Sequence, residues 1–215
     1  MSAPEVAVID YGVGNLFSVQ RGLEYCGANV TITADHEKVL SAPRVVLPGV
    51  GAFGKAMNEL QCLGLVDIIR RIAEQGVPLL GICLGMQLLF DESEEFGITR
   101  GLGLIPGRVV PVPATTASGD RQKIPHIGWS ALQPSGASVD WAETLLKDNA
   151  PGDAAYFVHS FMAIPDQPAH RIANCLYGEN EIAAVVGRAN ISGCQFHPEK
   201  SGEVGLKILR AFCGS

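Results

Sequence analysis

Two patterns of apolar residues alternate along the first part of the chain. Short continuous apolar runs predict strands buried on both faces, whereas apolar residues three and four positions apart predict amphipathic helices. The predicted strands cover 6–10, 29–33, 44–47 and the run that begins at Val77. The predicted helices cover about 16–26, 35–41, 55–62 and 65–75. This β-α-β-α-β order predicts a mostly parallel central sheet flanked by helices.

The pattern changes in the second half of the chain. Between about 91 and 135, glycine and proline interrupt β-like pieces near 104–112 and 122–132, which predicts an irregular antiparallel extension of the sheet. Helices are predicted over about 138–147 and 202–213, and strands over 154–161, 170–176, 181–187 and 191–196. No repeat or long linker divides the chain, so we expect a single α/β domain over residues 1–215 with a mixed, mostly parallel sheet.

Composition narrows the class of protein. The 215 residues are 47% hydrophobic and 18% charged, which is typical of a globular protein with a sizeable core. The net charge of -6, without a basic cluster, argues against nucleic-acid binding. No apolar run reaches the roughly 18 residues of a membrane span, and no signal-peptide pattern is present, so no membrane partner is expected.

Cysteine and histidine usage argues against bound metals and disulfides. The six cysteines form no CxxC pair, and the five histidines lack metal-ligand spacing. We therefore expect no metal site, no disulfide framework and a reducing, cytoplasmic location. The Walker pattern and the GxGxxG pattern are also absent, so no cofactor is expected.

One stretch combines a predicted strand, a tight turn and a predicted helix. The turn reads Gly81-Ile-Cys83-Leu-Gly85, and a strand that turns sharply into a helix between glycines lifts the middle side chain out of the core. A thiol at a helix N-terminus should have a lowered pKa, as a nucleophilic cysteine requires. The alternative is a buried structural cysteine.

A histidine and a carboxylate end the last predicted strand. In an extended segment His197 and Glu199 point to the same side, so the carboxylate can accept a hydrogen bond and fix the tautomer of the imidazole. Alone this pair is more often a surface ion pair. Together with Cys83 it supplies the three parts of a thiol acyl-transfer site.

Acyl transfer also needs two donors for the oxyanion. The N–H of Leu84, directly after the nucleophile, is one candidate. The glycine-rich loop 48–54, at the carboxyl end of a parallel strand, can supply the other through an N–H near Val50 or Gly51. The alternative is that this loop is only a tight connection between the strand and the next helix.

Three strings resemble the class I, triad-type glutamine amidotransferases: Pro48-Gly-Val-Gly-Ala-Phe-Gly54, Gly81-Ile-Cys-Leu-Gly-Met-Gln87 and Gln195-Phe-His-Pro-Glu-Lys-Ser201. The resemblance covers essentially the whole chain and implies a flavodoxin-like core that hydrolyses L-glutamine to glutamate and ammonia. The strings Asp10-Tyr-Gly-Val-Gly-Asn15, Pro125-His-Ile-Gly-Trp129 and Tyr156-Phe-Val-His-Ser160 are similar to those of the glutaminase subunits of imidazole glycerol phosphate synthase. That likeness implies a heterodimer with a (β/α)8-barrel cyclase subunit, which receives the ammonia in histidine biosynthesis.

The resemblance implies a role for each matching residue. The implied triad is Cys83, His197 and Glu199, with Val50 and Leu84 at the oxyanion hole. The positions that handle glutamine are Gly51, Gln87, Glu95, Ser160 and Phe161; Glu95 suits the α-ammonium and Gln87 the α-carboxylate. The positions implied at the barrel interface are Asn15, Trp129 and Lys200, whose alternative roles are a helix N-cap, a core aromatic and a solvated lysine.

Two positions depart from the family pattern. Phe161 stands where a tyrosine is usual, so only a backbone contact would remain there, and Ser130 stands where asparagine often follows Gly-Trp. The other functions considered are a triad glutaminase of another pathway, a stand-alone cysteine peptidase or deglycase, and a binding module without catalysis. Because a Val-Gly linkage can rotate cheaply, we also hypothesise that the donor near Val50 turns toward the site only when the partner and its nucleotide bind.

Overall fold

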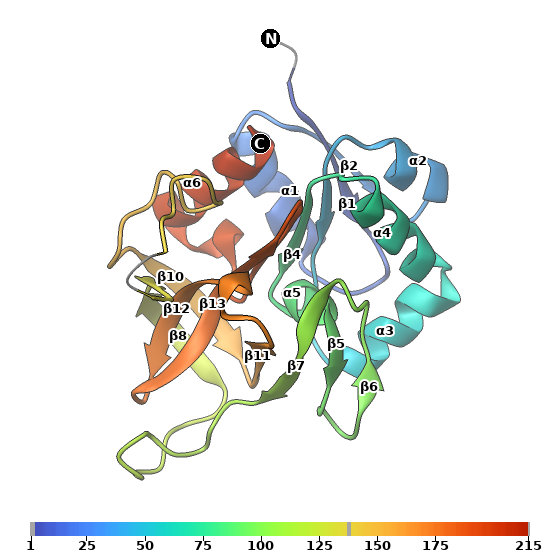
Figure 1. Cartoon of the computed structure of the whole chain (residues 1–215). Coiled ribbons are helices and arrows are strands. Elements are labelled where there is room, and N and C mark those ends of the chain that lie inside the picture. The colour runs from blue at the N-terminus through green and yellow to red at the C-terminus, as the bar shows by residue number, and fades with distance from the viewer. Residues whose placement is uncertain (1–2, 137–138, 215) are drawn as a thin grey trace.

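Parallel pairing of the N-terminal strands builds one half of a large sheet. The computed structural model describes residues 3–136 and 139–214. Within them, the largest sheet contains eight strands, of which β2, β1, β3, β4 and β14 run parallel and the rest antiparallel (Figure 1). In spatial order these strands are β2 (Asn29–Thr33), β1 (Glu5–Ile9), β3 (Val45–Leu47), β4 (Leu79–Ile82), β14 (Ile191–Cys194), β13 (Asn180–Arg188), β12 (Arg171–Tyr177) and β9 (Gln133–Pro134).

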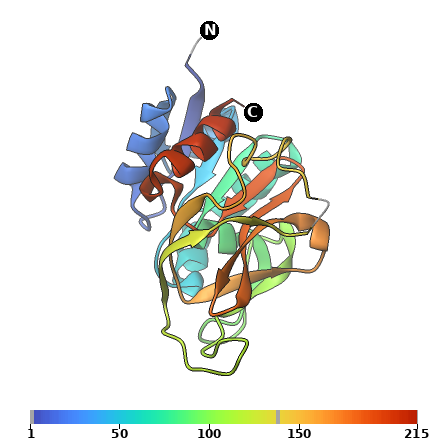
Figure 2. The ribbon, with the colours of Figure 1, turned by 90° about the vertical axis from the view of Figure 1, so that its left-hand side faces the viewer.

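Helices cover both faces of the parallel half. The helices are α1 (Leu16–Tyr25), α2 (His36–Ser41), α3 (Phe53–Cys62), α4 (Leu65–Glu74), α5 (Leu84–Leu88) and α6 (Gly202–Cys213), with short 3-10 turns at η1 (Pro168–His170) and η2 (Pro198–Lys200). Helices α1 and α6 lie side by side on one face, and α2, α3 and α4 lie on the other (Figures 1 and 2). This arrangement confirms the predicted α/β fold with a mixed sheet flanked by helices.

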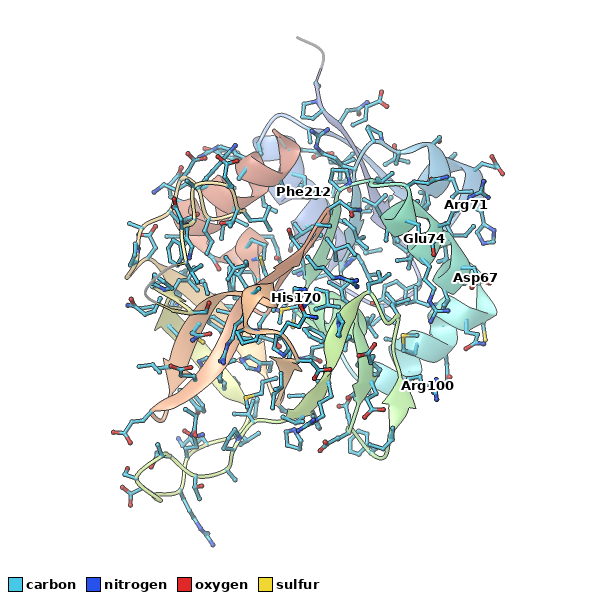
Figure 3. The ribbon with its side chains drawn as sticks, viewed as in Figure 1. Asp67, Arg71, Glu74, Arg100, His170 and Phe212 are labelled. Carbon is cyan, nitrogen blue, oxygen red and sulfur yellow. The ribbon has the colours of Figure 1, made fainter. Side chains whose placement is uncertain are left out.

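The alternation of side chains along β1 explains why its sequence is continuously apolar. Val6 and Val8 pack with α1 and α6, whereas Ala7 and Ile9 pack with α2, α3 and α4. A strand covered on both faces needs apolar residues at every position. The helices need only one apolar face, and α4 accordingly carries Asp67, Arg71 and Glu74 on its outer side (Figure 3).

Two smaller sheets form the irregular part of the chain. One has the order β11 (Phe161–Pro165), β7 (Ile105–Pro111), β5 (Phe90–Ser93) and β6 (Thr99–Arg100). The other pairs β8 (His126–Ala131) with β10 (Ala154–His159) in antiparallel register. The predicted antiparallel extension is therefore present, partly as separate sheets beside the main one (Figure 1).

The predicted helix over 138–147 is wrong. Residue 138 lies outside the described residues, residues 139–141 have no regular secondary structure, and residues 142–147 form turns and a bend. Trp141, Leu145 and Leu146 have the spacing of one helix face. They are buried against the main sheet, but in an irregular segment rather than in a helix. In the described ranges, no helix is long and apolar enough to cross a membrane.

Candidate active site

A strained residue joins β4 to α5. Cys83 has φ 55° and ψ -110°, a conformation that residues with a side chain rarely adopt. The flanking glycines leave room for this elbow, because a Cβ on Gly85 would collide with the carbonyl of Leu47 and one on Gly81 would lie 2.7 Å from the Gly85 carbonyl oxygen. The elbow predicted from the sequence is present; the helix that follows ends at Leu88, and Phe90 already belongs to β5.

A buried hydrogen bond joins His197 to Glu199. The distance from Nδ1 of His197 to Oε1 of Glu199 is 2.8 Å, and the two side chains are 3% and 1% exposed. The contact agrees with the sequence prediction, but the extended geometry expected for it is wrong. Residues 198–200 form the turn η2 rather than an extended segment, and this turn brings the carboxylate back to the ring.

The charge of His197 depends on its two neighbours. Burial disfavours the imidazolium, but interactions with the Cys83 sulfur and the Glu199 carboxylate outweigh it and raise the pKa of His197 to about 9. Nε2 of His197 is buried and has no hydrogen-bond partner among the residues that the structure describes. This nitrogen is therefore the one available for proton exchange with a group in the pocket.

One pocket of about 360 Å³ brings most of the predicted site residues together. Its lining includes Cys83, His197, the two predicted oxyanion positions and all five positions expected to handle glutamine: Val50, Leu84, Gly51, Gln87, Glu95, Ser160 and Phe161. Glu199 lies behind His197 and does not line it. The pocket can hold a small ligand such as an amino acid beside a thiol and an imidazole.

A carbonyl of the glycine-rich loop already accepts a hydrogen bond from one of the two predicted oxyanion donors. The N–H of Leu84 donates to the carbonyl of Gly49 over 3.3 Å. In a trans peptide the C=O and the N–H point in opposite directions, so the N–H of Val50 faces away from Leu84. The two predicted donors are therefore not aimed at a common point in this conformation.

Two of the predicted glutamine-handling side chains already have partners. Oε2 of Glu95 accepts a hydrogen bond of 2.6 Å from the N–H of Phe53 at the start of α3. Nε2 of Gln87 donates to the carbonyl of Phe161 at 2.9 Å and to Oε1 of Gln195 at 3.0 Å. Both N–H bonds of Gln87 are thus used, so in this conformation only its amide oxygen is left to meet a ligand, whereas the sequence prediction is that Gln87 donates to the α-carboxylate.

The site also contains residues that the sequence had not singled out for it. Pro125, Val158 and His159 line the pocket, and Nε2 of Gln195 lies 3.9 Å from the Cys83 sulfur. Gln195 lies two residues before His197 in the Gln-Phe-His-Pro-Glu string, which is the one local signal that could have found it. His159 is placed at the pocket by the pairing of β10 with β8, and local sequence patterns do not reveal this pairing.

The predicted interface residues lie outside the pocket on the surface. Trp129 is 59% exposed, so the alternative that it is a core aromatic is wrong. Asn15 is exposed and caps α1 by accepting a hydrogen bond of 3.4 Å from the N–H of Ser18, and Lys200 is exposed on η2. No group of histidine, cysteine and acidic side chains suited to a metal ion occurs in the parts of the chain that the structure describes.

A thiol at a strained elbow, a histidine oriented by a carboxylate and a nearby pocket define a class of enzyme, the cysteine-dependent acyl-transfer enzymes. Comparison with known proteins narrows this class. A model of the family "Glutamine amidotransferase class-I" matches residues 7–213. The structure resembles that of PurLQS from Thermotoga maritima with a TM-score of 0.71 and 20% identity, covering 99% of this chain and 98% of that one. This likeness concerns the fold.

Closer relatives are also known. The chain is 50% identical over 207 residues to imidazole glycerol phosphate synthase subunit HisH 1 of Legionella pneumophila (strain Lens), covering 96% of this chain and 97% of the relative. It is 47% identical over 209 residues to the HisH subunit of Geobacillus thermodenitrificans (strain NG80-2), covering 97% and 95%. The chain therefore belongs to the class I glutamine amidotransferases and, within them, to the family of imidazole glycerol phosphate synthase HisH subunits.

Proposed function

We propose that the chain is the glutaminase subunit of an imidazole glycerol phosphate synthase. It hydrolyses L-glutamine to glutamate and ammonia and supplies the ammonia to a cyclase subunit. The observation that carries this proposal is the pocket that places Cys83 and His197 together, in a chain so similar to HisH subunits over nearly its whole length. Residues 1–215 act as one amidotransferase domain in this proposal.

The catalytic sequence follows from the positions of three side chains. The Cys83 thiol gives its proton to Nε2 of His197, and the sulfur attacks the side-chain amide carbon of glutamine to form a tetrahedral intermediate. His197 passes a proton to the departing ammonia from Nε2, while Glu199 holds Nδ1 and stabilises the imidazolium. A water molecule, deprotonated by His197, then hydrolyses the thioester and releases glutamate.

The pocket can orient the amino-acid end of glutamine. We assign the α-ammonium to the carboxylate of Glu95 and the amide oxygen of Gln87, since both are acceptors on the pocket wall. Gly51, Ser160 and Phe161 line the same pocket and offer backbone groups and a hydroxyl to the α-carboxylate. Phe161 has no phenolic oxygen, so its polar contact is restricted to the backbone.

The oxyanion donors explain how the activity can be controlled. We propose that the Gly49–Val50 peptide, rather than the Val-Gly linkage that follows it, rotates on activation, which frees the N–H of Leu84 and turns the N–H of Val50 toward the site. Before rotation the tetrahedral intermediate has no pair of donors, and glutamine hydrolysis is slow. This arrangement prevents the release of ammonia when the cyclase has no nucleotide to receive it.

We assign the partner face to the surface that carries Asn15, Trp129 and Lys200. Trp129 contacts Tyr156 edge to face at 6.0 Å between ring centroids, and the neighbouring Ile127 is 58% exposed. Exposed aromatic and aliphatic side chains of this kind are typical of interfaces. The partner in this proposal is a (β/α)8-barrel cyclase that forms a heterodimer with the chain and receives ammonia through an internal channel.

A reducing location agrees with the state of the cysteines. All six cysteines, each within the described residues, are free. Burial raises the pKa of Cys175 to about 12 and that of Cys213 to about 11, so these two remain thiols. We therefore place the enzyme in the cytoplasm.

The test is to capture the cyclase and to assay the pair. The purified chain is mixed with the cyclase subunit of the same organism, and glutamate release is measured with and without the cyclase nucleotide substrate. We expect complex formation and a large rise in the rate when the nucleotide is present. A stand-alone cysteine hydrolase would instead work at one rate in all conditions, and glutamine hydrolysis that no condition supports would contradict the proposal.

A further inference from the structure

A relay of hydrogen bonds through two buried histidines runs from strand β8 to the wall of the pocket. Oγ of Ser130 lies 2.9 Å from Nε2 of His126, whose Nδ1 lies 3.0 Å from Nε2 of His159. Nδ1 of His159 lies 2.8 Å from the carbonyl oxygen of Phe161. The two histidines are 1% and 6% exposed, and the catalytic steps above use neither of them.

The carbonyl of Phe161 determines which atom is the donor in every hydrogen bond of this relay. A carbonyl oxygen only accepts, so Nδ1 of His159 must carry the hydrogen. A neutral imidazole has one N–H, so Nε2 of His159 must accept from Nδ1–H of His126. Nε2 of His126 must in turn accept from the hydroxyl of Ser130. Each ring is thus fixed in one tautomer.

The surroundings keep both rings neutral. Burial lowers the pKa of His126 to about 4. Burial, together with the positive charges of His126 and His197, also lowers the pKa of His159 to about 4, against the opposing effect of its bond to Phe161. The ring of His126 stacks between Phe157 and Tyr177, with centroids 5.0 Å and 4.1 Å away.

The relay of hydrogen bonds continues beyond the Phe161 carbonyl. Phe161 also accepts from Nε2 of Gln87, and this nitrogen donates in addition to Oε1 of Gln195. The amide of Gln195 is therefore oriented with its nitrogen toward the Cys83 sulfur, 3.9 Å away. Gln195 is fully buried, so its amide does not have water as an alternative partner.

We propose that His126 and His159 are positioning residues that, through the Phe161 carbonyl, orient the amides of Gln87 and Gln195 and thereby set the reactivity of the Cys83 thiol. The role in glutamine hydrolysis rests on the function proposed above. Ser130 fills the position expected for asparagine and provides the outermost donor of the relay. The alternative is that the two histidines are merely satisfied core residues, in which case the thiol is indifferent to them.

The test compares variants that break the relay with one that preserves it. His126→Phe keeps a stacked ring but removes both hydrogen bonds, whereas His126→Asn keeps an N–H where Nδ1 stood. Ser130→Ala removes only the outermost donor, and His36→Asn alters an exposed histidine on α2 as the control. Alkylation of Cys83 by iodoacetamide is followed by peptide mass spectrometry, with the exposed Cys62 as the internal reference.

We expect His126→Phe to slow alkylation of Cys83 about fivefold and to raise the KM for glutamine by about the same factor. The reason is that the buried Nε2 of His159 loses its donor, the Nδ1–H of His126. Cys62 should react as before. His126→Asn should restore most of both values, and Ser130→Ala should change them by about twofold. Histidine nitrogen NMR should show Nδ1–H tautomers for both rings, still neutral at pH 6 in the folded protein.

The outcomes separate this proposal from the function on which it rests. Alkylation and KM in His126→Phe equal to those in His36→Asn would overturn the relay. If His126→Phe does not fold, an unchanged Cys83 rate in Ser130→Ala together with Nε2–H tautomers in the wild type would overturn it instead. A relay-dependent thiol in a chain that never hydrolyses glutamine would contradict the glutaminase function and leave the relay standing.

Discussion

The N–H of Leu84 donates to the carbonyl of Gly49 over 3.3 Å, so a backbone group of the glycine-rich loop occupies the place where an oxyanion would be stabilised. The Gly49–Val50 peptide has the freedom to leave this place, because Gly49 carries no Cβ and Val50 is 41% exposed. Cys83 and His197 are thus in position before activation, and we expect the conformation of the loop to determine when they work.

Replacing Val50 by proline tests this control by the loop. Proline has no N–H, so Val50→Pro removes the second oxyanion donor without altering the other side chains of the pocket. We expect glutamine hydrolysis in the activated complex to fall by about a hundredfold, while the slow rate of the isolated chain stays unchanged. Steady-state glutamate release measures both rates.

Val50→Ala is the matched control, because it keeps the N–H and shortens an exposed side chain. It should retain the full activation. Full activation in Val50→Pro as well would mean that another group stabilises the oxyanion.

Replacing Glu199 by glutamine tests the role of the buried carboxylate. The interactions with Cys83 and Glu199 raise the pKa of His197 to about 9, against the effect of burial. Glu199→Gln removes the negative charge at 2.8 Å from Nδ1, so the pKa of His197 should fall, and kcat should drop about a hundredfold or more. NMR titration of His197 and steady-state kinetics provide the two readouts.

The same pair predicts how stability varies with pH. The folded-state pKa of His197 lies above the ordinary histidine value of 6.5, so its stabilisation is complete below about pH 6.5 and is lost as the pH rises through about 9. Chemical unfolding between pH 6 and pH 10 should show this loss in the wild type and a smaller one in Glu199→Gln. Parallel curves would contradict the assignment of the shift to this ion pair.

Replacing Gly85 by alanine tests the packing of the elbow. A Cβ there would collide with the carbonyl of Leu47 in the adjacent parallel strand, so Gly85→Ala should destabilise the fold by about 3 kcal/mol. Gly54→Ala is the control, because its nearest neighbour, Oγ1 of Thr99, is 3.5 Å from the added Cβ and Gly54 lies in a helix. It should be neutral or stabilising by about 0.5–1 kcal/mol. Equal effects in urea unfolding would contradict the collision.

Local sequence patterns were sufficient to predict the strands and helices of the parallel half of the molecule. The strand predicted over 29–33 is β2 with the same limits, and Asn15 caps α1 as its position suggested. Burial on both faces makes each strand continuously apolar, and each helix has one apolar face, so the two patterns are distinct. The elbow at Cys83 and the pair His197–Glu199 were also predictable, because their partners are close in sequence.

Pairing between distant segments was not predictable in the same way. The segment 139–147 has apolar residues at helical spacing, yet its turns are held by packing of Trp141 and Leu146 against the main sheet. The pairing of β8 with β10 brings His126 opposite His159, and only this register carries the relay to the pocket. The orientation of the Gly49–Val50 peptide is also invisible in the sequence, since a glycine permits either orientation.

The most direct test of the glutaminase function is the complex of the Cys83→Ala variant with the cyclase, supplied in turn with glutamine and with ammonium salt as the nitrogen source. Formation of imidazole glycerol phosphate is measured in both cases and compared with the wild-type complex. We predict that synthesis from glutamine is abolished, because no thioester can form, whereas synthesis from ammonia continues at the wild-type rate. Glutamine-dependent synthesis that persists in the variant, or the loss of both activities, would contradict this function.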